Sequence, residues 1–72
     1  MPKAPAPWEF RRAALRLAFE RRRQTGSHER WIHQDGRAVT IPIHGGSEIG
    51  PPLFHKMLAQ LGVSADEFQK LR

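Results

Sequence analysis

Apolar side chains recur at helical spacing near the N-terminus of the chain. The residues between Trp8 and Phe19 are rich in Ala, Leu and Arg, which all favour helix. Pro7 suits the first turn, because its missing N–H has no partner there in any case. The pattern predicts a helix from residue 7 to about residue 19. Its main apolar stripe is Leu15, Ala18 and Phe19, extended by Trp8 and Arg11, with Phe10, Ala14 and Leu17 beside it.

The same spacing returns near the C-terminus. Pro51-Pro52 begins a second predicted helix that carries Leu53, Met57, Leu58 and Leu61 on one face, and Gly62 ends it. Ser64 and Glu67 form the sequence pattern of a capping box, in which each residue bonds the other's backbone N–H. A short last helix is therefore expected over residues 65–71.

Between the helices the pattern alternates every second residue, which is typical of a β-hairpin. Gln34-Asp35-Gly36 predicts a three-residue loop with Gly36 in the left-handed region. That loop pairs Trp31 with Val39 and Glu29 with Ile41, and leaves His28, Arg30, Ile32, Ala38, Thr40 and Pro42 on the opposite face. A two-residue loop would instead set Ile32 against Val39. We prefer the first register, because it groups the aromatic ring with the branched aliphatic residues.

The charged segment 20–24 is ambiguous. It is compatible with a continued helix, but a sheet needs a strand before the hairpin, so we expect a short, highly charged edge strand. The predicted order is α-β-β-β-α-α. This is a small α+β domain, with a three-stranded antiparallel sheet and helices packed on one face.

Length and composition restrict the class of protein. The 72 residues allow one small domain, and we expect residues 1–6, with Pro2 and Pro5, to form a disordered leader before a single domain at 7–72. There is no cysteine, which excludes disulfides and thiolate metal sites. No apolar run approaches the roughly 20 residues that span a bilayer. We expect a cytoplasmic protein with no membrane partner.

The charge balance points to a polyanionic partner. Lys and Arg number 12 against 7 Asp and Glu, which gives a formal net charge of +5. Such an excess on a small chain favours nucleic acid. The run Arg21-Arg22-Arg23 is either a solvated face or a phosphate-binding edge, and the sequence supports both interpretations equally.

Gly26-Ser27-His28 lies where the hairpin begins. Gly26 allows a sharp turn, Ser27 adds a hydroxyl that can bond local backbone, and His28 places an imidazole at the start of a strand. Histidine suits proton transfer near neutral pH, because its ordinary pKa lies there.

Four stretches of the chain resemble the HicA family of toxin ribonucleases: RQTGSH (23–28), HQDGR (33–37), VTIPIH (39–44) and MLAQLGV (57–63). The resemblance extends over residues 18–71. It implies a fold similar to a double-stranded-RNA-binding domain. It also implies a messenger-RNA endonuclease of a type II toxin–antitoxin system, inhibited by an antitoxin of the HicB type. The family's catalytic histidine corresponds to His28.

Cleavage of RNA without a metal requires a group that takes the proton of a ribose 2′-hydroxyl and groups that stabilise the phosphate charge. We assign His28 to the proton transfer. The candidate RNA contacts are Arg21, Arg22, Arg23, Ser27, Arg30, His44 and Lys56. No cofactor is expected, and a zinc site is disfavoured, because the spacing of the histidines fits no finger pattern.

Two other functions remain open from the sequence. A non-catalytic RNA-binding domain of the same fold would explain the charge, but it has no need of an imidazole after Gly26-Ser27. An adaptor that binds only protein would leave the charge unused. We expect the antitoxin to cover the face that carries His28, Arg30 and Thr40; inhibition from the helical side is the alternative.

Overall fold

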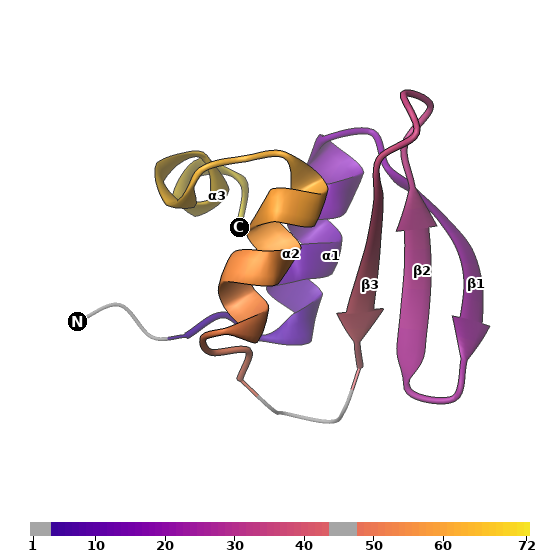
Figure 1. Cartoon of the computed structure of the whole chain (residues 1–72), viewed down its shortest axis with the longest axis horizontal. Coiled ribbons are helices and arrows are strands. Elements are labelled where there is room, and N and C mark those ends of the chain that lie inside the picture. Colours follow the sequence, from indigo (N-terminus) through magenta and orange to yellow (C-terminus); the bar gives the residue numbers. More distant parts are fainter. Residues whose placement is uncertain (1–3, 44–47) are drawn as a thin grey trace.

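The computed structural model describes residues 4–43 and 48–72. The elements follow the predicted order: α1 (Pro7–Arg16), β1 (Glu20–Thr25), β2 (His28–Ile32), β3 (Ala38–Pro42), α2 (Leu53–Leu61) and α3 (Ala65–Leu71) (Figure 1). The three strands form one antiparallel sheet in the order β1-β2-β3. The predicted α+β architecture is confirmed.

The register of the hairpin is the one that the sequence favours. Trp31 is opposite Val39 and Glu29 is opposite Ile41, so the alternative register with a two-residue loop is wrong. Gly36 adopts a positive φ of 98°, which closes the three-residue loop without the steric cost that a side chain would add. Because successive side chains of a strand point to opposite faces, His28 and Glu29 lie on different sides of the sheet.

The charged segment is a strand rather than a continuation of the first helix. All six residues of β1 are exposed, and the ladder to β2 is irregular between Arg21 and Arg23. An edge strand with this much charge and a local irregularity is a poor template for unwanted pairing with another chain. The expectation of a charged edge strand is confirmed.

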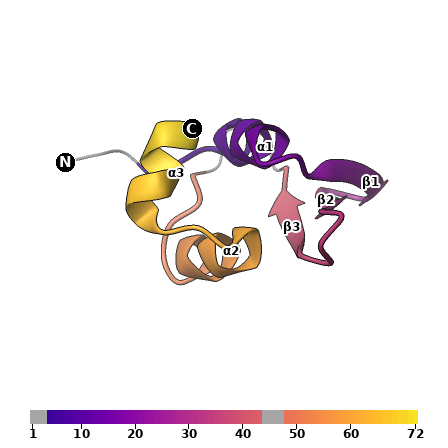
Figure 2. The ribbon, with the colours of Figure 1, turned by 90° about the horizontal axis from the view of Figure 1, so that it is seen from above.

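The three helices lie beside β3, at the opposite end of the sheet from β1 (Figures 1 and 2). In the core, the ring centroid of Phe10 in α1 is 4.6 Å from that of Phe68 in α3 and 6.0 Å from that of Phe54 in α2. Val39 and Ile41 of β3 are fully buried in the same cluster. The sheet and the three helices therefore share a single core.

The first helix differs from its predicted extent and its predicted buried face. It ends at Arg16 rather than near residue 19, because Ala18 has a positive φ of 68° and the N–H of Phe19 bonds the Ala14 carbonyl at 2.9 Å. Phe19 is buried, but it lies in the segment that connects α1 to β1 and not in the helix. The buried residues of α1 are Pro7, Phe10, Ala13 and Ala14.

Trp8 and Leu15, assigned by the sequence to the apolar stripe, are exposed. The physical reason is the early end of the helix, since Leu15, Ala18 and Phe19 share a helical face only if the helix continues. The prediction is wrong for Trp8 and Leu15, whereas Phe19 and the adjoining Phe10 and Ala14 are buried as the pattern indicates.

The ends of the domain are fixed by capping and by backbone contacts. Gly62 adopts the left-handed conformation after α2, and the Ser64–Glu67 capping box is present before α3, as predicted. Pro5 is buried and its carbonyl accepts the N–H of Ile49 at 2.7 Å, so packing extends into the segment 1–6 that we expected as a leader. No helix in the described residues is long and apolar enough to cross a membrane.

Candidate functional site

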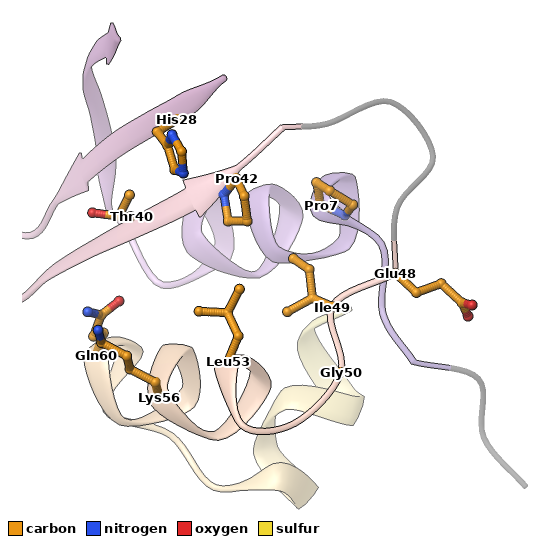
Figure 3. Close-up of a pocket in the computed structure, with 10 residues that line it drawn as sticks. All are labelled: Pro7, His28, Thr40, Pro42, Glu48, Ile49, Gly50, Leu53, Lys56 and Gln60. Atoms are coloured by element: carbon orange, nitrogen blue, oxygen red, sulfur yellow. The ribbon is translucent and has the colours of Figure 1, made fainter. Parts of the chain in front are cut away.

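A groove runs between the edge strand β3 and helix α2, with a volume of about 500 Å³ (Figure 3). This size lies within the roughly 300–1,000 Å³ typical of ligand sites. His28 and Thr40 belong to the sheet wall, and Leu53, Lys56 and Gln60 belong to the helix wall. The remaining lining residues are Pro7, Pro42, Glu48, Ile49 and Gly50.

The two walls are joined by an arginine at the far end of the hairpin. Arg37 donates through Nη1 to the carbonyl of Leu61, the last residue of α2, at 2.6 Å. Asp35 accepts from both the backbone N–H of Arg37 and its Nε, and these bonds hold the pKa of Asp35 below its ordinary value. This connection fixes the hairpin relative to the helix, and so fixes the width of the groove.

His28 owes its position to the turn before β2. Gly26 adopts a positive φ of 58°, which lets Gly26-Ser27 connect Thr25 directly to its partner His28. The Ser27 carbonyl accepts the N–H of Ile43 at 2.7 Å, which ties the turn to the end of β3. The imidazole is exposed on the face of the sheet that the helices do not cover.

Positive charge lies on the helix wall of the groove and on the sheet face that carries His28. On the sheet face, Arg30 donates through Nη1 to Thr40 Oγ1 at 2.9 Å, next to His28. Arg23 pairs with Arg30 in the ladder and therefore projects from the same face. Lys56 stands on the helix wall.

The arginine run of β1 is divided between different surfaces. Arg23 faces the His28 side, whereas Arg21 donates to the carboxylate of Glu29 at 3.2 Å on the side facing the helices. Arg22 lies at the irregularity in the ladder and lines a separate hollow beside Phe19. The structure therefore places Arg23 and Arg30 on the sheet face of His28 and Lys56 in the His28 groove, and it places Arg21 on the opposite face.

The other histidines occupy different environments. His33 packs its ring against Phe19, with the centroids 5.2 Å apart, and its Nδ1 accepts the N–H of Asp35 at 3.0 Å. His55 is exposed on α2 and does not line the groove. His44 lies outside the described residues. Among the described residues, His28 is the histidine that lines the groove.

Sequence reasoning missed Gln60, which lines the groove on the same wall as Lys56. The two residues are four positions apart on α2, which places them on one helix face. That spacing was available in the sequence. The sequence did not indicate that this helix face lies opposite β3, because that arrangement depends on how the helix packs.

Comparison with known protein families identifies a match. A family model described as the HicA toxin of bacterial toxin–antitoxin systems matches residues 9–63, which include both walls of the groove. No curated protein matches the chain.

Proposed function

As the chain belongs to the HicA family of bacterial toxins, we propose that it is an endoribonuclease that cleaves messenger RNA in the groove between β3 and α2. One observation carries the proposal: His28, an exposed imidazole, lines this groove, and Lys56 lines its opposite wall. An imidazole suits proton transfer near neutral pH, and the cations suit a phosphodiester.

In the proposed reaction, His28 accepts the proton of a ribose 2′-hydroxyl. The 2′-oxygen then forms a bond to the adjacent phosphorus while the bond from phosphorus to the 5′-oxygen breaks. The products are a 2′,3′-cyclic phosphate end and a 5′-hydroxyl end, and the leaving oxygen takes up a proton. We assign the first transfer to His28 and assign no residue to the second.

The cations stabilise the negative charge that builds on the phosphate in the transition state. Arg30 is supported by its bond to Thr40, so its guanidinium needs little reorganisation to meet the substrate. Lys56 approaches from the opposite wall, and Arg23 extends the basic face along the sheet. We propose that Gln60 contacts a base, because its amide can both donate and accept.

The test compares two exposed histidines in the full-length protein. Single-turnover cleavage of a labelled RNA is measured for the parent chain, His28→Ala and His55→Ala. We expect His28→Ala to lower the rate by about 10²–10⁴-fold, the usual contribution of general acid–base catalysis. His55→Ala is the matched control, since it removes an exposed imidazole outside the groove, and we expect the parent rate.

Equal thermal unfolding midpoints of the variants confirm that folding is preserved. A His28→Ala protein that cleaves at the parent rate removes His28 from the mechanism. A parent chain that binds RNA and leaves it intact favours the alternative, a non-catalytic RNA-binding domain.

A further inference from the structure

A second open surface lies on the opposite side of the sheet from His28, between α1 and the edge strand β1. We call it the α1–β1 surface; its residues are Trp8, Arg11, Arg12, Leu15 and Arg21, above Glu29 and Trp31. Helix α1 packs against β3, and β1 lies at the far edge of the sheet (Figure 2). None of the groups assigned to RNA cleavage at the groove lies here.

The apolar part of this surface is unusually exposed. Trp8 and Leu15 are 53% and 63% accessible, the two largest exposures among the bulky apolar side chains of the described residues. They are seven residues apart on α1, which places them on one helix face about 10 Å from each other. Apolar side chains grouped in this way and rimmed by charge are typical of a protein-binding site.

A buried carboxylate lies beneath the charged part. Glu29 is only 2% exposed, and its oxygens accept from Trp31 Nε1 at 3.1 Å and from Arg21 Nη1 at 3.2 Å. Arg11 Nη1 stands 3.8 Å from the same carboxylate. Glu29 therefore pairs with Arg11 of α1 and Arg21 of β1, while both arginine side chains remain partly open to solvent.

We propose that the α1–β1 surface docks an acidic protein segment that carries apolar side chains, and that this segment belongs to the antitoxin. Arg11, Arg12 and Arg21 exceed the single carboxylate of Glu29, so the surface attracts negative charge. Trp8 and Leu15 supply the apolar contacts that give such an interface most of its energy. Membership of a toxin–antitoxin family makes a protein partner of the toxin expected.

Two other occupants fit less well. A second copy of the chain would bring a further net charge of +5 against the same arginines. RNA could stack a base on Trp8 and contact Arg12, but Leu15 offers no ring and Glu29 already engages Arg11 and Arg21. An acidic, apolar protein segment satisfies both halves of the surface.

The docking site is separate from the groove, so it adds a contact that leaves His28 uncovered. His28 and Glu29 are neighbours in β2 but face opposite sides of the sheet. The antitoxin would then hold the toxin through one face of the sheet and remain free to cover the other. The proposal rests on the toxin family and on this surface, and it does not require RNA cleavage.

The experiment uses full-length His28→Ala protein, labelled for nuclear magnetic resonance. In this variant, cleavage of the RNA probe cannot affect the result. The probes are a panel of short synthetic peptides in which Glu and Asp flank Leu and Phe, a matched panel with Gln and Asn in place of the acids, and a single-stranded RNA. We expect the acidic peptides to shift the signals of Trp8, Arg11, Leu15 and Arg21. The neutral peptides should bind at least about tenfold more weakly.

The double variant Trp8→Ser with Leu15→Ser should lose at least about tenfold in affinity for the acidic peptides. Leu53→Ser is the matched control, since it removes an exposed leucine from the His28 groove. This variant should bind the peptides as the parent does. The proposal is overturned if no acidic peptide binds at millimolar concentration. It is also overturned if the shifts fall on the His28 groove, or if RNA rather than peptide shifts the α1–β1 residues.

Discussion

The two open surfaces of this domain have similar ingredients and different construction. The His28 groove and the α1–β1 surface both combine apolar side chains with cations. Lys56 of the groove and Arg30 of the His28 face come from separate elements, and among the described residues neither forms an ion pair with a carboxylate. On the α1–β1 surface, two arginines share one buried glutamate. The two surfaces therefore differ in whether a carboxylate of the chain already pairs with the cations.

A buried carboxylate changes what its arginines can do. On the α1–β1 surface, Glu29 offsets part of the charge of Arg11 and Arg21, so these two side chains attract an anion less strongly than unpaired arginines would. Arg30 is held by the neutral hydroxyl of Thr40, which leaves its full charge for an anion. The net charge of +5 is therefore divided between two surfaces that we expect to prefer different partners.

The largest effect we expect in this comparison is on stability, at Glu29. Glu29→Ala leaves Trp31 Nε1 without its acceptor and places Arg11 and Arg21 together without a counter-charge. We expect a loss of about 1–3 kcal/mol in the free energy of unfolding, measured by urea denaturation. Glu48→Ala, at an exposed carboxylate of the groove, is the control and should change it by less than about 0.5 kcal/mol.

Equal losses for the two glutamate variants would show that the carboxylate of Glu29 is not a structural anchor. Glu29→Gln separates shape from charge, because an amide oxygen can still accept from Trp31. We expect it to lose less stability than Glu29→Ala.

The second prediction concerns the base contact in the groove. Gln60→Ala removes an amide that lines the wall opposite His28. If the amide reads a base, the distribution of cleavage sites in a random RNA pool should broaden, with discrimination falling up to about tenfold, since one hydrogen bond contributes roughly 1–1.5 kcal/mol. Gln24→Ala, on the exposed edge strand, serves as the control. An unchanged cleavage pattern would limit Gln60 to a packing role.

A third prediction separates the cations of the two surfaces. Lys56→Ala should reduce the salt dependence of single-stranded RNA binding by about 0.7 in the slope of log K against log salt, as expected for one lost phosphate contact. Arg21→Ala should leave that slope unchanged, because Glu29 engages this guanidinium on the opposite face. Titrations at several salt concentrations give both slopes. If Arg21→Ala lowers the slope as much as Lys56→Ala, RNA contacts both faces.

The hairpin was predictable in detail because local rules determine it. Gly36 at the closing position fixed the loop length, and the loop length fixed the pairing of Trp31 with Val39. The same alternation placed His28 on the open face. The charged β1 strand was less certain, since its composition also suits helix.

The buried face of α1 was beyond local reasoning. Two adjoining apolar stripes were available in the sequence, and the choice between them depended on where the helix ended. Ala18 adopts a positive φ, and an alanine side chain gives no sequence signal for this conformation. The approach of α2 to β3, which brings Lys56 and Gln60 to His28, depends likewise on packing between distant segments.

The smallest effect should come from the exposed apolar side chains of α1, and two leucines test it directly. Leu15 is 63% accessible on the α1–β1 surface, whereas Leu17 packs partly against the core. We expect Leu15→Ser to change the free energy of unfolding by less than about 0.5 kcal/mol, and Leu17→Ser to lower it by about 1 kcal/mol. Thermal and urea unfolding of the two variants measure the difference. An exposed leucine that contributes nothing to folding is free to serve a partner. If Leu15→Ser instead destabilises the chain as much as Leu17→Ser, the side chain of Leu15 is a structural part of the fold, and its role as a docking contact loses its main support.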